Sequence, residues 1–214
     1  EICACLVGSE MCIRDRIKMR QGVLSLNIES FALKELFGII AKGRRSFEIK
    51  HQELQVDPTE AVVKADKALT LFMINTLTEN ARKYTPEYGH ITLSTKETDE
   101  YVEISVSDDG PGLSEEDVNR ILGEKVYDSG AIGMGTAADT EELRRQKGSG
   151  FGLMNCKGII EKYRKTNAVF SVCCFSIDST LGKGSRFYFR LPKGVKRTLS
   201  ICCLLYTSPS PRDM

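Results

Sequence analysis

Residues 101–112 have the sequence YVEISVSDDGPG, an alternating run that ends in two acids and a glycine–proline turn. Side chains alternate between the two faces of a strand, so Val102, Ile104 and Val106 form an apolar row that Asp108 continues. The other row, which we expect to face water, consists of Glu103, Ser105, Ser107 and Asp109. The run therefore predicts a strand whose core-facing row ends in an acid, and a buried acid needs a partner.

The flanking sequence supplies further elements by the spacing of its apolar residues. Residues 90–97 form a hairpin with this strand, and a helix over 67–84 precedes them, ended by Pro86. Ser114, with Asp117 three residues on, opens a short helix by capping. Additional helices are expected over 24–40 and 151–163, and additional strands within 44–54, 60–66, 168–177 and 185–192.

Helices interleaved with mostly hairpin-connected strands predict the α+β class. We expect a two-layer α/β sandwich in which a mixed or antiparallel sheet carries helices on one face. Residues 123–147 have no strong period and several glycines. They predict a mobile loop, or lid, with a short helix near 139–146, since a long loop in a compact domain is usually functional or disordered.

Composition narrows the class of protein further. The 214 residues are 41% hydrophobic with a formal net charge of +1, as in one or two globular domains. Near-neutral charge gives no footprint for nucleic acid or an anionic membrane surface. The longest apolar run, ICCLLY at 201–206, is far short of the roughly 20 residues of a membrane-spanning helix. We therefore expect neither nucleic acid nor a membrane as a partner of this domain.

The two ends of the chain are related through the genetic code. Residues 6–16, LVGSEMCIRDR, can be encoded by a DNA whose reverse complement, one base out of frame, encodes CLLYTSPSPR, the sequence of residues 203–212. That DNA resembles a sequencing-library adapter, so we interpret 1–16 and 202–214 as translated adapter sequence and exclude them from the fold. Natural inverted repeats are the alternative. Residues 17–25 and 194–201 are then a linker remnant and a tail of a natural segment whose true ends are missing. Five of the eight cysteines lie in the adapter-like ends, and no CxxC pair occurs.

Thr76, Asn80 and Lys83 form a stripe along the helix NTLTENARKYT, at i, i+4 and i+7. A neutral oxygen such as that of Asn80 can complete a Mg²⁺ shell whose other ligands are phosphate oxygens and water. Lys83, one turn on, would offer a positive charge to the same phosphates. Taken alone, Asn80 and Lys83 are equally well explained as solvated helix positions.

Asp108 has two possible partners. An adenine amino group can donate a hydrogen bond to its carboxylate, with Gly110 and Gly112 allowing backbone and base to approach closely. The alternative is a carboxylate that caps a turn or a helix. A third element, KGSGFGL, places Gly148, Gly150 and Gly152 before a helix, where backbone N–H groups can bind phosphate. The dinucleotide fingerprint does not apply, because no strand precedes these glycines.

Together, NTLTENARKYT, DDGPG, a flexible insert, GSGFGL and GKGSRFYFRLP resemble the ATP-binding domain of sensor histidine kinases, in the GHKL ATPase superfamily. The resemblance covers 26–193 and implies a Bergerat-type fold that binds ATP and Mg²⁺. By it, Asn80 is a Mg²⁺ ligand, Lys83 a phosphate contact and Tyr84 a wall beside the base. Asp108 is the adenine acceptor, and the remaining pocket residues are Gly110, Gly112, Gly148, Gly150, Gly152 and Leu153.

The sequence departs from the family at two points. Thr76 occupies the place where such kinases commonly carry Asn and hydrolysing relatives Glu, so no general base for water is identifiable. The family's phosphoacceptor histidine is absent, because His51 and His90 fall on predicted strands and are interpreted as ordinary surface or core residues. Arg144 and Arg145 of the insert could assist phosphoryl transfer or simply form a charged helix face.

The leading hypothesis is a histidine kinase catalytic domain that transfers the γ-phosphoryl to a histidine on a separate dimerisation segment. The expected partners are that segment and a response regulator, and the expected location is cytoplasmic. The parent's membrane anchoring is left open. The alternative is a nucleotide-responsive interaction module with little or no catalysis. A serine kinase or ATPase of the superfamily is disfavoured because residue 76 is not a glutamate.

Overall fold

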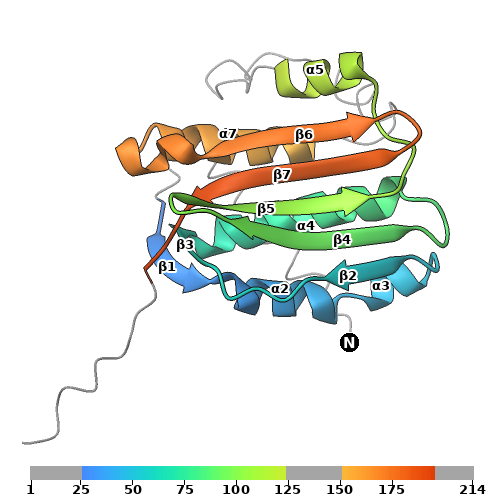
Figure 1. Cartoon of the computed structure of the whole chain (residues 1–214), viewed down its shortest axis with the longest axis horizontal. Coiled ribbons are helices and arrows are strands. Elements are labelled where there is room, and N and C mark those ends of the chain that lie inside the picture. Colours follow the sequence, from blue (N-terminus) through green and yellow to red (C-terminus); the bar gives the residue numbers. More distant parts are fainter. Residues whose placement is uncertain (1–25, 124–150, 196–214) are drawn as a thin grey trace, which may run out of the picture.

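The computed structural model describes residues 26–123 and 151–195, and a five-stranded sheet spans most of them (Figure 1). Its strand order is β2-β4-β5-β7-β6, with β2 parallel to β4 and the other pairs antiparallel. The strands are β2 (Glu53–Val56), β4 (His90–Glu97), β5 (Tyr101–Asp108), β7 (Gly184–Pro192) and β6 (Cys174–Thr180). The mixed sheet predicted from the sequence is confirmed, with the opening run as β5 at its centre.

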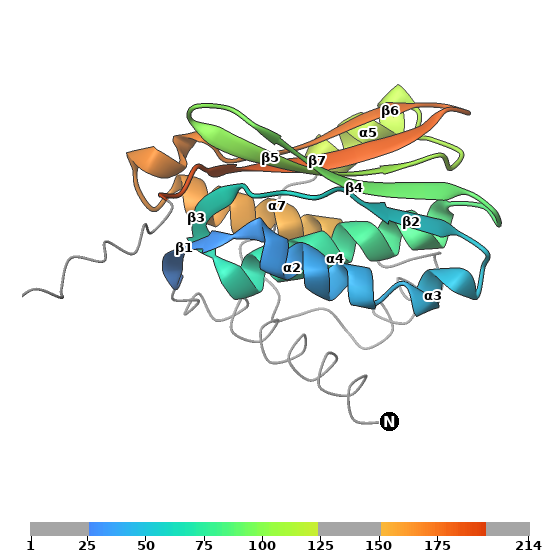
Figure 2. The same cartoon turned by 60° about the horizontal axis from the view of Figure 1, so that its bottom comes forward.

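Three helices cover one face of this sheet (Figure 2): α2 (Leu33–Lys42), α4 (Lys67–Tyr84) and α7 (Phe151–Arg164). Their inward side chains and those of the facing strands form one apolar core. In β5 the predicted row of Val102, Ile104 and Val106 is at most 1% exposed. The predicted α+β class with helices on one face is therefore confirmed.

The helix α4 has the predicted bounds, Lys67–Tyr84. It begins at Asp66, whose Oδ1 accepts the Leu69 N–H at 3.0 Å as an N-cap. The hydroxyl of Tyr163 on α7 accepts the Asp66 N–H at 2.9 Å, which ties the start of α4 to its neighbour. The Asp66 side chain therefore defines the N-terminal end of α4, and the hydrogen bond to Tyr163 connects that end to α7.

The predicted N-terminal helix over 24–40 is wrong in its first part. Residues Ile28–Ala32 form β1, which pairs antiparallel with β3 (Val62–Asp66) in a separate two-stranded sheet, and only α2 is helical. The helical spacing of apolar residues in α2 continues weakly into β1, which favours a helix there. The strand conformation of β1 depends instead on pairing with β3, for example of Ser30 with Lys64. A short helix, α3 (Arg45–Glu48), also occupies part of the strand predicted within 44–54, and a 3₁₀ helix, Ala168–Val172, occupies the start of the strand predicted over 168–177.

On the open face of the sheet, the polar row of β5 is less exposed to water than the sequence predicts. Glu103 is 5% exposed and Ser105 is 2% exposed, although both point away from the helices. Long side chains from β7 lie over them, as Arg186 and Arg190 both bind Glu103. Asp109 is exposed as predicted. The α5 helix (Glu115–Gly123) lies beyond β6, with Ser114 Oγ accepting the Asp117 N–H at 3.1 Å as its predicted cap.

Within 26–123 and 151–195, no helix has the length and apolar character needed to span a bilayer. The predicted lid over 123–147 falls almost wholly outside the described residues, as do Arg144 and Arg145.

Candidate functional site

The last two turns of α4 carry three of the predicted site residues. Asn80 is half-buried, and its side chain makes no hydrogen bond to any other residue that the structure describes. Lys83 is exposed, and its Nζ lies 5.1 Å from the ring centroid of Tyr84. Tyr84 itself is 54% exposed. The end of α4 thus presents a free carboxamide, a cation and an accessible aromatic ring.

Asp108 ends β5 on the helix-facing side of the sheet and is half-buried. Its Oδ1 accepts the Gly110 N–H at 3.0 Å, and the backbone of Ser185 also donates to the carboxylate. Burial raises the pKa of Asp108 above its ordinary value, more than these backbone hydrogen bonds lower it. None of the lysines and arginines in the described residues pairs with it. This carboxylate is therefore partly desolvated without a counterion.

Gly110 brings the Asp108 turn against the end of α4. A Cβ at this position would lie 2.7 Å from Asp108 Oδ1 and 3.1 Å from the Tyr84 carbonyl oxygen. Real Cβ atoms essentially never come as close as the first distance, and the second is tight, so a side chain here would force the turn or Asp108 to shift. The structure thus places two predicted regions, Asp108–Gly112 and the Lys83–Tyr84 turn, side by side.

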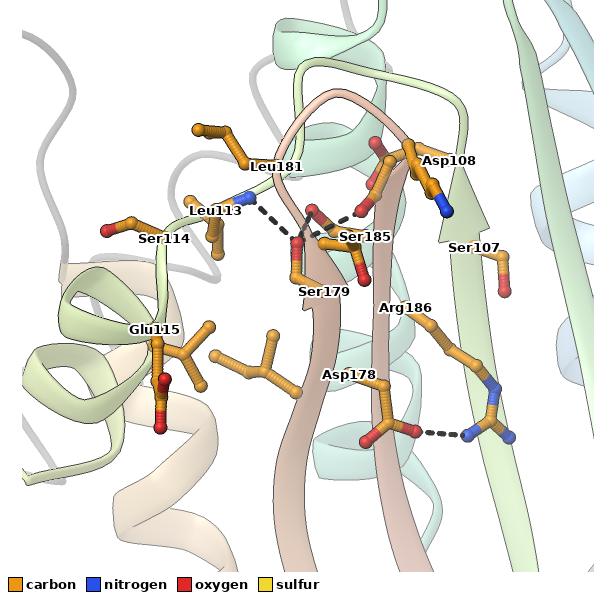
Figure 3. Close-up of a pocket in the computed structure, with 15 residues that line it drawn as sticks. Ser107, Asp108, Leu113, Ser114, Glu115, Asp178, Ser179, Leu181, Ser185 and Arg186 are labelled. Carbon is orange, nitrogen blue, oxygen red and sulfur yellow. Dashed lines mark hydrogen bonds and ion pairs between the residues drawn. The ribbon is translucent and has the colours of Figure 1, made fainter.

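The β6–β7 hairpin holds the same turn from the other side (Figure 3). Ser179 Oγ accepts the Leu113 N–H at 2.8 Å, lies 3.0 Å from the Gly184 carbonyl oxygen to which it donates, and lies 2.9 Å from Ser185 Oγ. Gly182 N–H donates to the Pro111 carbonyl at 2.7 Å. These contacts fix the shape of the Asp108 turn through residues some 70 positions later in the chain.

Gly112 is the second glycine that this interlocking requires. Its φ of +69° is in the left-handed region, and an added Cβ would meet the Thr180 carbonyl oxygen at 2.1 Å. From its place in the sequence, Gly112 is expected to let a base approach closely. In the structure its lack of a side chain admits the β6–β7 hairpin, which is a structural reason for the glycine.

A cavity of about 830 Å³ opens between α5 and the β6–β7 hairpin, with Asp108 in its wall (Figure 3). Its lining is mixed, with polar side chains such as Ser114, Ser179 and Ser185 beside apolar ones such as Leu113 and Ile177. Asn80, Lys83 and Tyr84 do not line it. Asp108 thus lies in the wall of this cavity, and the turn that follows it also packs against the end of α4.

The sequence analysis missed Ser179 and Ser185. Both lie in the core-facing row that continues from Asp108, because Asp108 pairs with Ser185 and Ser185 with Ser179. Strand alternation alone could have placed Ser185 on that face. Its register against Asp108, however, follows from the pairing of two strands that are distant in sequence, which the sequence does not show.

The start of α7 lies against α4. A Cβ on Gly152 would meet Thr76 Cγ2 at 2.9 Å, and the Thr76 side chain shares a hydrogen bond with the buried Cys156 thiol. Leu153 is half-buried and packs on the core. Gly148 and Gly150 lie outside the described residues. The side chain of Thr76 therefore contacts α7.

These features define a class: a two-layer α/β sandwich whose central strand ends in a half-buried carboxylate beside the end of a long helix. Residues 65–195 match the family of histidine kinase-, DNA gyrase B- and HSP90-like ATPases, and the chain belongs to this family. The ATP-binding catalytic domain predicted from the sequence motifs is thereby confirmed.

Curated relatives include the adaptive-response sensory kinase SasA of Synechococcus sp. (strain JA-2-3B'a(2-13)), 31% identical over 161 residues, which are 75% of this chain and 36% of SasA. The sensor histidine kinase WalK of Bacillus subtilis (strain 168) is 31% identical over 132 residues, 61% of this chain and 19% of WalK. The chain thus spans about a third or less of the length of these relatives.

Solved structures agree in fold. The mycobacterial sensor histidine kinase MprB has a TM-score of 0.57 at 19% identity, over 78% of this chain and 97% of the solved one. Full-length ShkA in complex with AMPPNP has a TM-score of 0.61 at 20% identity, over 81% of this chain and 32% of ShkA.

Proposed function

We propose that this chain binds Mg-ATP as the catalytic domain of a sensor histidine kinase, and that it transfers the γ-phosphoryl to a histidine on a separate dimerisation segment. Family membership and the sensory-kinase relatives support the proposal. The observation that carries it is the half-buried carboxylate of Asp108, which has backbone donors but no cationic partner among the described residues and lies beside the end of α4. A response regulator is the expected next acceptor.

In this proposal Asp108 accepts a hydrogen bond from the adenine amino group. A desolvated carboxylate gains more from such a donor than a solvated one, because water competes less for it. Tyr84 offers a flat apolar surface beside the base, and its exposed ring is accessible for that purpose. Recognition of the base would thus come from the Asp108 turn, and the glycine at position 110 keeps that turn narrow.

The phosphates would be held from α4. The half-buried Asn80 carboxamide, which has no partner among the described residues, fits a single neutral ligand in a Mg²⁺ shell. Lys83 would add a positive charge one turn further on. When bound, Mg²⁺ supplies neutralisation of phosphate charge, and phosphoryl transfer of this kind depends mainly on positioning and electrostatics.

Calorimetry of Mg-ATP binding tests the proposal, comparing the unaltered chain with Asp108→Asn. We expect binding by the unaltered chain and a loss of roughly 100-fold in the variant, because an amide presents an N–H group where the ligand needs an acceptor. Asn80→Ala should lower affinity for Mg-ATP more than affinity for adenosine. Equal Mg-ATP affinity of the unaltered chain and Asp108→Asn would contradict the assignment.

A nucleotide-responsive interaction module is the second candidate. It is favoured by Thr76, which is bound to α7 and offers no base. Adding a histidine-bearing dimerisation segment in trans with radiolabelled ATP separates the two functions. Label on the histidine supports the kinase, whereas ATP binding without any transfer supports the module. Free ATP hydrolysis is expected to be slow in either case.

A further inference from the structure

The C-terminal end of α4 is capped by a side chain from outside the helix. The last carbonyl groups of a helix have no partner within it. Gln52, just before β2, directs its Nε2 at the carbonyl oxygens of Arg82, Thr85 and Pro86, at 3.1, 2.6 and 3.3 Å. Gln52 is only 5% exposed, so this contact is part of the interior.

The surroundings determine the orientation of the Gln52 amide. Three carbonyl oxygens face it, and only the NH₂ end can donate to them. The Oε1 atom is then left buried without a hydrogen-bond partner in the part of the chain that the structure describes. An unsatisfied buried acceptor is unfavourable. Packing alone therefore does not explain a glutamine at this position. Its two N–H donors do fit the unpaired carbonyl groups at the end of α4.

The capped turn is the one that carries the proposed phosphate and base contacts. Lys83 and Tyr84 lie between Arg82 and Thr85, two of the residues whose carbonyls Gln52 holds. The Tyr84 carbonyl is also the group against which Gly110 packs. A shift of this turn would therefore move both Lys83 and the wall that supports the Asp108 turn.

We infer that Gln52 is a positioning residue of the nucleotide site, which acts by fixing the last turn of α4. The inference rests on the proposed function, because it assigns Lys83 and Tyr84 to nucleotide binding. Lys50 has a lesser part in the same cap, since its Nζ lies 3.3 and 3.4 Å from the carbonyl oxygens of Arg82 and Lys83 but is more exposed to water.

The test compares Gln52→Met with Gln55→Met in the full chain. Both remove an amide from the same short stretch, but Gln55 is exposed and donates to the nearby Asp57 side chain, so it is a matched control. We expect Gln52→Met to weaken Mg-ATP binding roughly tenfold, because small misplacements of binding groups are costly. The Gln55→Met variant should bind like the unaltered chain. Gln52→Glu, which keeps the shape but exchanges donors for acceptors, should also bind weakly.

A double-mutant cycle with Lys83→Ala distinguishes positioning from general destabilisation. If Gln52 acts through Lys83, the two substitutions together should cost less than the sum of their separate effects. Hydrogen exchange of the nucleotide-free chain gives a second readout. The Thr85 amide, which donates to the Ala81 carbonyl at 2.9 Å, should exchange faster in Gln52→Met and unchanged in Gln55→Met.

Each outcome has a separate meaning. If the unaltered chain binds Mg-ATP and Gln52→Met binds it equally well, the positioning role is wrong and the proposed function stands. Fully additive effects of Gln52→Met and Lys83→Ala would also overturn it. If the unaltered chain binds no Mg-ATP, the proposed function fails, and the inference fails with it.

Discussion

The central strand β5 carries a buried carboxylate on its open face and a half-buried one on its helix face, and the two are held in different ways. Glu103, on the open face, has a side chain that is 6% exposed and is bound by Arg186 at 2.5 Å and Arg190 at 2.8 Å. Burial tends to raise the pKa of Glu103, but the hydrogen bonds and charges of the two arginines outweigh it and lower the pKa. Asp108, on the helix face, has no such cation within 26–123 and 151–195, and burial raises its pKa.

This difference separates a carboxylate with a structural role from the one that we propose binds adenine. The two arginines that neutralise Glu103 are themselves held in place, with Arg186 4.7 Å from the Tyr188 ring centroid and Arg190 4.7 Å from that of Tyr101. Nothing is left for a ligand to satisfy there. Among the residues that the structure describes, Asp108 accepts hydrogen bonds from backbone groups alone, at the end of the strand and in the wall of a cavity. The partners of the two carboxylates therefore distinguish their roles, because Glu103 is neutralised by two arginines and Asp108 is held by backbone donors.

The largest effect is expected from removing the partners of Glu103. In the double variant Arg186→Met, Arg190→Met a buried carboxylate loses both cations, which should lower the free energy of unfolding at pH 7 by about 3 kcal/mol. Urea denaturation measures this. Adding Glu103→Gln to the double variant should restore much of the stability, because the unpaired charge is then gone. An unchanged stability of the double variant would show that the arginine contacts do not hold Glu103.

The two carboxylates should also respond to pH with opposite signs. The lowered pKa of Glu103 contributes stability that is present above its unfolded value of 4.5 and is lost as pH falls through the folded pKa. The raised pKa of Asp108 means that the folded state holds its proton longer, so stability falls as pH rises from 3.8 through the folded pKa.

The unfolding free energies of the unaltered chain, Asp108→Asn and Glu103→Gln, measured between pH 3 and 7, test these opposite pH dependences. Relative to the unaltered chain, Asp108→Asn should become more stable as pH rises, and Glu103→Gln less stable. The same sign for both variants would contradict the distinction between the two carboxylates.

The sequence predicted most of what lies close together along the chain. Strand alternation placed Asp108 and Asp109 on opposite faces, and the apolar period gave the bounds of α4. The prediction that Glu103 faces water failed because alternation assigns a face but not what covers it, and Arg186 and Arg190 lie more than 80 positions later. Similarly, the helix predicted over 24–40 is wrong at β1, because the strand conformation of β1 depends on pairing with β3. The roles of the site residues stay predictions.

A substitution of Ser179 tests how much the β6–β7 hairpin contributes to holding the Asp108 turn in place. Ser179→Ala removes the acceptor of the Leu113 N–H and the contact with Ser185, and should cost about 1 kcal/mol of unfolding free energy. It should also weaken Mg-ATP binding by about threefold, because the turn loses one of its supports. Denaturation and calorimetry measure the two effects. Ser176→Ala, on the same strand but facing away, is the control, and an equal loss there would show that the Ser179 contacts are unimportant.

The smallest effect is expected for Asp109→Asn, and it sharpens the comparison at the point where two acids are adjacent. The Asp109 side chain is 46% exposed, its Oδ1 accepts the His90 N–H at 2.9 Å, and its Oδ2 lies 3.1 Å from His90 Nδ1. An asparagine keeps the Oδ1 acceptor and changes only the exposed Oδ2 contact with His90, so stability should change by less than about 0.5 kcal/mol. Mg-ATP affinity should change by less than about twofold for the same reason. Calorimetry beside Asp108→Asn checks this, and a loss as large as that of Asp108→Asn would mean that position in the turn, rather than the face of β5, determines which carboxylate binds.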